Sequence, residues 1–196
     1  MTQFRELTRA DILPLDQYER ERRTHRQRIT ALKQNRRVEV GPLATFYFEN
    51  FDTMWHQVHE MLAVERGGEA QIVDELAAYN PLVPKGDELI ATVMFEIDDP
   101  VQRARVLGQL GGVEHRMYVS FAGEKVIGDA DPTRENTSPE GKASSVQFMR
   151  FRFNRAQKEK FRAPGTRVEV GIEHPNYHHF AVLSDPARQT LAADLA

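Results

Sequence analysis

The chain has 196 residues, a net charge of −3, 40% hydrophobic and 28% charged residues, and no cysteine. These values are typical of a folded globular protein with one sizeable core. The lack of cysteine excludes disulfides, thiol nucleophiles and cysteine-ligated iron–sulfur clusters, and is compatible with a cytoplasmic location. No run approaches the 18 apolar residues of a membrane span, and residues 1–7 lack the apolar stretch of a signal peptide, so we expect neither.

A first helix is predicted between about Pro14 and Asn35, because proline suits a first helical turn. Residues 20–37 carry eight arginine and lysine residues against one glutamate, a net charge of +7, which leaves −10 for the remainder. This basic segment is either a solvated face that balances the acidic body or a surface for phosphates or an acidic partner. The positions that share one helix face are Leu15, Tyr18, Arg22, His25, Ile29 and Leu32. Arg22 and His25 therefore either pair with carboxylates of the body or border an anionic site or a partner helix.

The following elements are predicted from periodicity and turn residues. In chain order they are strands at 37–40 and 44–49, helices at 52–66 and 69–79, a strand at 89–97, a helix at 100–110, strands at 116–121, 125–128, 145–154, 167–173 and 179–183, and a helix from 185. The long polar connection 129–144 predicts a mobile hairpin tip or a lid. We therefore predict an α+β fold, with a mostly antiparallel curved sheet of about five to seven strands and helices on one face.

We expect a single domain over residues 1–196. Its three parts are an N-terminal helical part at about 1–80, a sheet-rich part at about 81–184 and a C-terminal helix at about 185–195.

Three histidines near the C-terminus are candidates for chemistry, because neutral imidazole is a good metal ligand. If residues 178–183 are extended, His178 and His179 point to opposite faces, and only one of them can converge with His174. A mononuclear metal site needs three protein ligands in a small volume. We therefore predict no cofactor and favour a turn-stabilising or partner-facing role. The alternative is a zinc or iron site formed by Glu173, His174 and His178.

The helix at 52–66 carries a second pair of histidines. His56 lies nearly opposite the apolar face and is expected to face water, and His59 lies at the boundary of that face. The order His-x-x-His-Glu differs from the di-iron and zinc-protease motifs, which disfavours a metal site here.

Arg150 and Arg152 share one face of the predicted strand 145–154. They form either a charged ladder on a solvated face or, if the sheet curls, a pocket that binds a carboxylate or phosphate. Glu65 falls on the apolar face of its helix and is expected to have a basic or amide partner, with Arg22, His25, Arg150 and Arg152 as candidates. The hypothesis is a polar cluster beneath the first helix that either pins the fold or binds a small anion.

Several short segments spread over nearly the whole chain form a recognisable pattern. They are Phe48-Glu49-Asn50-Phe51-Asp52-Thr53, Glu60-Met61-Leu62, Glu75-Leu76-Ala77-Ala78-Tyr79-Asn80, Leu82-Val83-Pro84 and His174-Pro175-Asn176-Tyr177. This pattern resembles an uncharacterised bacterial family, domain of unknown function 3501. In that family, genes often lie beside rubrerythrin and an iron–sulfur oxidoreductase, which implies a peroxide-defence or electron-transfer setting. The family has no established activity, so the resemblance implies no catalytic residue.

The sequence lacks the phosphate-loop, dinucleotide-binding, hydrolase and zinc-finger motifs. We interpret the chain as an accessory or interaction protein of a bacterial redox or peroxide-defence system, which docks a partner through its basic first helix and binds a small anion. The alternatives are a metal-dependent enzyme that uses the C-terminal histidines and a nucleic-acid-binding protein that uses residues 20–37. The net charge of −3 disfavours the latter. The sequence is compatible with a homodimer.

Overall fold

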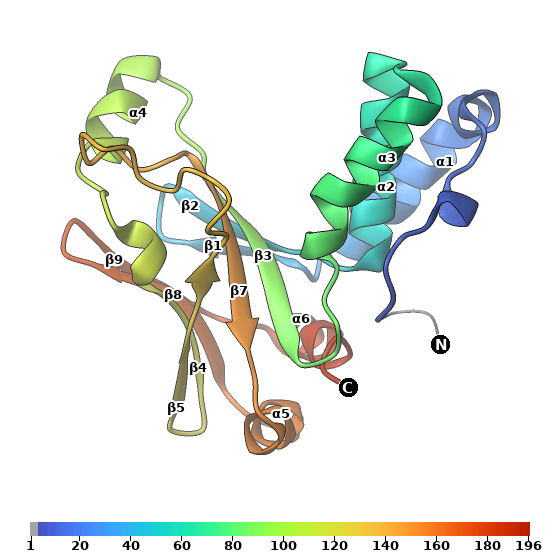
Figure 1. Cartoon of the computed structure of the whole chain (residues 1–196). Coiled ribbons are helices and arrows are strands. Elements are labelled where there is room, and N and C mark those ends of the chain that lie inside the picture. Colours follow the sequence, from blue (N-terminus) through green and yellow to red (C-terminus); the bar gives the residue numbers. More distant parts are fainter. Residues whose placement is uncertain (1–3) are drawn as a thin grey trace.

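Two antiparallel β-sheets form the centre of the computed structural model, which describes residues 4–196 (Figure 1). Their strands are β1 (Arg37–Val40), β2 (Ala44–Phe48), β3 (Glu88–Phe95), β4 (Met117–Phe121), β5 (Glu124–Ile127), β6 (Asp129–Ala130), β7 (Val146–Arg152), β8 (Val168–His174) and β9 (Tyr177–Val182). The five-stranded sheet has the order β1-β2-β3-β7-β6, and the four-stranded sheet has the order β5-β4-β8-β9. The predicted α+β class and antiparallel pairing are confirmed, with the strands divided between two sheets. Residues 1–3, part of the segment inspected for a signal peptide, lie outside the described residues.

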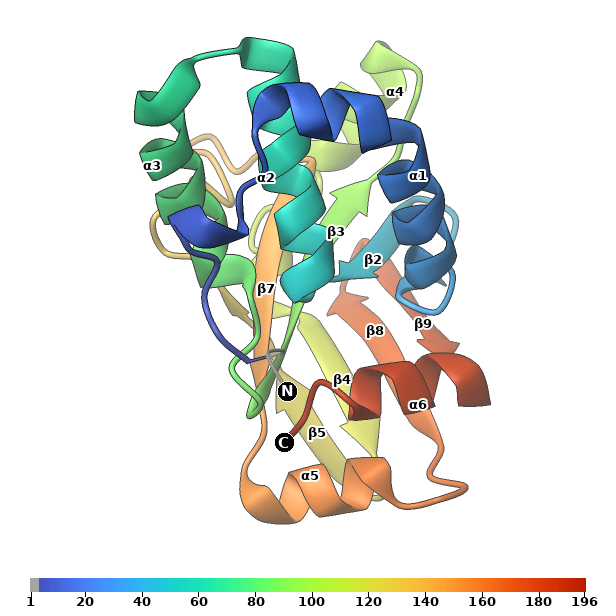
Figure 2. The ribbon, with the colours of Figure 1, turned by 90° about the vertical axis from the view of Figure 1, so that its right-hand side faces the viewer.

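The helices of the described chain pack around these sheets. They are α1 (Leu15–Lys33), α2 (Phe51–Glu65), α3 (Gly68–Tyr79), α4 (Pro100–Leu107), α5 (Arg155–Arg162) and α6 (Asp185–Ala192), with short 3-10 turns at Arg9–Asp11, Asn80–Leu82 and Val113–His115. Figures 1 and 2 show α1, α2 and α3 grouped on one side of the five-stranded sheet, and α5 and α6 together at one end of the molecule. Among residues 4–196, no helix combines the length and the apolar composition needed to cross a membrane.

The main core lies between the two sheets, because alternate residues of each strand point to it. In β3 the inward residues are Leu89, Ala91, Val93 and Phe95, and the four-stranded sheet faces them with its own buried apolar residues. The opposite face of β3 is also covered: Ile90 belongs to a second apolar cluster with residues of α2 and α3. Burial on both faces explains why the sequence of β3 is a nearly continuous run of apolar residues.

The helix α5 was not predicted. Asn154 caps it by accepting a hydrogen bond from the Gln157 N–H at 2.9 Å, and Phe161 is its buried residue. The helix has only eight residues, most of them polar, and it follows directly on a predicted strand, so the segment offered too few apolar positions for a prediction from periodicity.

The polar connection 129–144 packs against the turn that follows α4. The Gly112 N–H donates to Thr137 Oγ1 at 3.0 Å, and the Ala143 N–H donates to the Leu107 carbonyl at 2.9 Å. A Cβ atom on Gly111 would lie 2.4 Å from the Gly141 carbonyl oxygen, closer than van der Waals contact allows. Glycine at 111 is therefore required by this close approach of two backbones.

We expect Gly111→Ala to lower the free energy of unfolding by about 1–3 kcal/mol, since the new methyl group must displace backbone. Gly108→Ala is the matched control, because Gly108 has φ −64° and ψ −15° and alanine adopts this conformation without strain. Urea unfolding of the three proteins tests the prediction. Equal stability of the two variants would show that the connection moves aside at no cost.

Candidate functional site

The face of α1 defined by the 3-4 spacing packs against the rest of the protein. Tyr18 and Ile29 are buried, and Leu15, Arg22, His25 and Leu32 are partly buried. The residues between them on the helix surface are exposed, except Gln17, which is partly buried. Figure 2 shows α1 passing across α2, so this face meets α2 directly. The interpretation that Arg22 pairs with a carboxylate of the body is confirmed.

Glu60 of α2 is the acceptor around which side chains of α1 meet. Arg22 donates through Nε to Oε1 at 2.9 Å and through a terminal nitrogen to Oε2 at 2.8 Å, and Arg26 also donates to Oε2. The Tyr18 hydroxyl donates to Oε1 at 2.8 Å. Arg22, and then Arg26 and Tyr18, therefore hold the pKa of Glu60 well below its usual range, against the opposing effect of burial. We call Tyr18, Arg22, Arg26, His56 and Glu60 the Glu60 cluster.

His56 extends this cluster by one hydrogen bond. Its Nδ1 lies 3.1 Å from the Tyr18 hydroxyl. Because Tyr18 gives its only proton to Glu60, its oxygen accepts from His56, which makes His56 the Nδ1–H tautomer. Burial lowers the pKa of His56 to about 4 and raises the pKa of Tyr18. At neutral pH, neutral His56 therefore donates to neutral Tyr18, and Tyr18 donates to charged Glu60.

The expectation that His56 faces water holds only in part, because the residue is half-buried. His56 lies away from the apolar face of α2, as the helical wheel indicated, but α1 covers that side of the helix. Packing between helices that are distant in sequence is not visible in the periodicity of either helix.

His59 supports the site by packing. It is 1% exposed, accepts the Leu13 N–H through Nε2 at 3.0 Å and contacts the Trp55 carbonyl through Nδ1 at 2.7 Å. Its ring lies 4.0 Å from the Trp55 ring and 4.7 Å from the Tyr18 ring, centroid to centroid. His25 stacks on Tyr18 at 5.4 Å. With both nitrogens engaged, His59 has a structural role.

We expect the free energy of unfolding to rise with pH between about 4 and 6.5, because there the unfolded chain binds a proton at His56 that the folded protein does not. The slope from His56 is at most about 1.4 kcal/mol per pH unit, reduced by the partial exposure of the ring. His56→Gln should lower this slope, whereas His178→Gln, at an exposed position, should preserve it. Urea unfolding across this pH range tests the prediction, and an unchanged slope in His56→Gln would contradict it.

Glu65 lies outside the Glu60 cluster. It is exposed and accepts a hydrogen bond from Gln71 Nε2 at 3.0 Å, so its partner is an amide. The expected basic partners pair elsewhere, and Arg22 pairs with Glu60. The polar cluster beneath the first helix therefore exists, but it is built one turn earlier on α2, where α1 crosses.

Arg150 and Arg152 line a hollow of about 360 Å³ on the outer side of the five-stranded sheet. Arg150 donates to buried Glu88 Oε2 at 2.7 Å and to the Pro81 carbonyl at 2.7 Å. Arg152 pairs with Asp129. A pocket is present, as one interpretation expected, but each guanidinium already has a carboxylate partner. The two arginines therefore hold β7 against its neighbours.

The C-terminal histidines point apart. In the β8–β9 register, His174 lies opposite Tyr177, and Glu173 lies opposite His178. His174 is buried, with Nε2 3.2 Å from the Gly111 carbonyl and Nδ1 3.2 Å from the Asn176 N–H, so it stabilises the turn. Glu173 and His178 are exposed on the other face. Within residues 4–196, no group of three or more histidine, aspartate or glutamate residues is arranged to hold a metal ion.

Sequence reasoning missed the central acceptor, Glu60, and two of its neighbours, Tyr18 and His56, as site residues. One signal was present. Tyr18 shares a helix face with Arg22, and His56 and Glu60 are four residues apart on α2, so each helix offers polar groups on one side.

The fold and the site together define an α+β protein with two facing sheets and a basic helix whose arginines pair with carboxylates of α2, mainly with Glu60. The chain belongs to the family described as "Protein of unknown function (DUF3501)", whose model matches residues 6–195. A crystal structure of a protein of unknown function from Burkholderia pseudomallei K96243 is similar, with 36% sequence identity, a TM-score of 0.91, and coverage of 98% of this chain and 100% of that chain. No match is found among curated proteins.

Proposed function

We propose that this chain is an accessory protein that docks an acidic surface of a partner protein through the exposed side of α1. The observation that carries the proposal is the arrangement of Arg22, Arg23 and Arg26. Glu60 holds Arg22 and Arg26, and Arg23 is exposed and makes no ion pair among residues 4–196. Three positive charges and the one negative charge of Glu60 give a net of +2. These arginines line a shallow hollow of about 650 Å³, which is also lined by Glu19, a carboxylate neutralised by its pair with Arg66.

Fixing the guanidinium groups in advance favours binding. Arg22 and Arg26 are held by Glu60, yet each keeps N–H groups that Glu60 does not use. Because less side-chain freedom is then lost on binding, a carboxylate or phosphate of the partner is bound at lower entropic cost. The same unused N–H groups of Arg22 and Arg26 suit a small anion.

The charge pattern supports a protein partner over nucleic acid. Most cations of segment 20–37 are neutralised internally, as in Arg20–Asp16, Arg28–Asp52, Arg36–Asp194 and Arg37–Glu39. Among residues 4–196, the free positive charge of this segment is therefore confined to α1, at Arg22, Arg23 and Arg26 and at Lys33 near the end of the helix. Nucleic-acid binding depends on many phosphate contacts, whereas a local charged patch is typical of protein recognition.

The partner belongs, in this proposal, to a bacterial redox or peroxide-defence system. The support is the genomic setting implied by the family, beside rubrerythrin and an iron–sulfur oxidoreductase. These two proteins from the same bacterium are therefore the first partners to test.

The test is titration calorimetry of each partner with wild type, Arg23→Glu and Arg155→Glu at about 50 and about 200 mM salt. Arg155 is an exposed arginine on α5, so its reversal changes the net charge equally at a remote place. We expect binding that weakens with salt and a loss of at least about tenfold for Arg23→Glu alone. An equal effect of the two reversals would refute docking through α1.

A further inference from the structure

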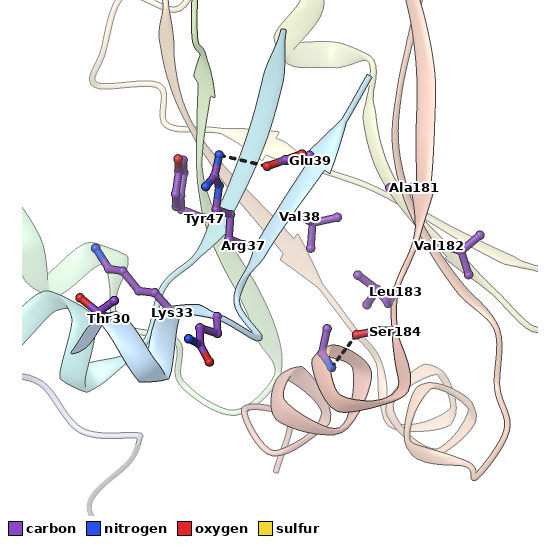
Figure 3. A pocket seen from close by; sticks show the side chains of 12 residues that line it. Thr30, Lys33, Arg37, Val38, Glu39, Tyr47, Ala181, Val182, Leu183 and Ser184 are labelled. Carbon is purple, nitrogen blue, oxygen red and sulfur yellow. Dashed lines mark hydrogen bonds and ion pairs between the residues drawn. The ribbon is translucent and has the colours of Figure 1, made fainter. Parts of the chain in front are cut away.

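The two sheets face each other along a seam between their edge strands, β1 and β9. At one end Tyr177 closes the seam: its hydroxyl donates to the Val40 carbonyl at 2.7 Å and accepts the Leu43 and Ala44 N–H groups at 2.9 and 3.0 Å. At the other end the strands separate and leave a hollow of about 730 Å³, where Val38 and Leu183 point toward one another (Figure 3).

Both edges direct backbone groups away from their own sheets. The Leu183 N–H donates to the Val168 carbonyl at 2.9 Å, so the alternation of an antiparallel ladder directs the N–H and C=O of Val182 away from β8. The Phe48 N–H donates to the Arg36 carbonyl at 2.9 Å, so Arg37 and Glu39 likewise direct theirs away from β2. Strand edges of this kind accept an added strand.

The side chains of the hollow define which strand fits. Val38 and Leu183 form apolar walls, and Val182 beside them is 46% exposed. Lys33, at the end of α1, lines the hollow and takes part in no ion pair among residues 4–196 (Figure 3). Backbone edges, apolar walls and an uncompensated cation together match an extended segment that alternates apolar and acidic residues.

The hollow is continuous with the docking surface on α1. Thr30 and Gln34 line both hollows, so a partner segment bound at the arginines of α1 extends directly into the seam. We infer that the seam between β1 and β9 binds an extended acidic segment of the same partner by β-strand addition. This inference rests on the proposed function and names the part of the partner that binds.

The experiment measures fluorescence anisotropy with a labelled hexapeptide of alternating glutamate and valine. Two comparison peptides carry lysine in place of glutamate, or methyl groups on every second backbone nitrogen. On the protein side, Val182→Pro removes one N–H that faces the seam without removing a bond to β8, and Val182→Ala keeps that N–H. Melting curves verify that each variant is folded.

We expect the acidic hexapeptide to bind, and the lysine and methylated peptides to bind at least about tenfold more weakly. Val182→Pro should weaken binding by about tenfold, and Val182→Ala by less. The inference is overturned if the acidic peptide shows no binding up to about 1 mM, or if methylation leaves its affinity unchanged. The methylated peptide still tests strand addition if Val182→Pro fails to fold.

The two proposals fail separately. If Arg23→Glu weakens partner binding while the hexapeptide does not bind, α1 remains the docking surface and the seam does not contribute. If the hexapeptide binds in the seam while Arg23→Glu leaves partner binding unchanged, the seam is a peptide site and docking through α1 is wrong.

Discussion

Replacing Arg36 with methionine should lower the free energy of unfolding by about 3–5 kcal/mol. Arg36 and Asp194 form a bidentate pair with N···O distances of 2.6 and 2.9 Å, and their side chains are only 5% and 1% exposed. Removing Arg36 takes a bidentate cationic partner away from a buried carboxylate, which costs more than the pair itself contributes. Because Arg36 precedes β1 and Asp194 follows α6, this pair ties the C-terminus to the five-stranded sheet.

The double variant Arg36→Met/Asp194→Leu is the informative control. With both charges removed, neither member of the pair remains as a buried ion without the other, so the double variant should be more stable than Arg36→Met. Urea unfolding at neutral pH measures both. A loss below about 1 kcal/mol in Arg36→Met, or a double variant less stable than the single one, would contradict the importance of this pair.

Glu60→Gln should lower the free energy of unfolding by about 2–3 kcal/mol at neutral pH. Two guanidinium groups lose their shared carboxylate, and the buried Tyr18 hydroxyl competes for the one remaining oxygen acceptor. Glu65→Gln is the matched control on the same helix, since Glu65 is exposed, and it should change stability by less than about 0.5 kcal/mol.

The effect of Glu60→Gln should depend on pH in a defined direction. Because the pKa of Glu60 is lowered by folding, its stabilisation is complete above the ordinary value of 4.5 and is lost as the pH falls toward the lowered value. The difference between wild type and Glu60→Gln should therefore shrink below pH 4.5. A difference that is constant with pH, or equal losses for Glu60→Gln and Glu65→Gln, would contradict the role of Glu60 as the charged centre of the cluster.

Local patterns in the sequence predicted much of this fold. The 3-4 spacing on α1 identified the face that is buried, and strand alternation predicted that at most one of His178 and His179 could converge with His174. The register shows that His178, the partner named for the alternative metal site, lies on the other face. In both cases the relevant geometry is fixed by residues close together in the chain. The polar partner expected for a carboxylate of α2 was also found, as an amide for Glu65.

Features set by long-range packing were not predictable in the same way. Nothing in α2 alone shows that α1 crosses at Glu60 and His56 and not at Glu65, because 38 residues separate Arg22 from Glu60. The division into two sheets depends on β7 pairing with β3 while β8 pairs with β4. Strand propensity does not determine this choice of partners.

Docking through α1 is the central claim, and arginine footprinting tests it most directly. Phenylglyoxal modifies exposed guanidinium groups, and mass spectrometry reports the extent at each arginine with and without the rubrerythrin or the iron–sulfur oxidoreductase. Arg23 is exposed and makes no ion pair within the described residues, so we expect the partner to slow its modification strongly while Arg155 on α5 reacts as before. Unchanged modification of Arg23 in a complex that is demonstrably formed would contradict the claim.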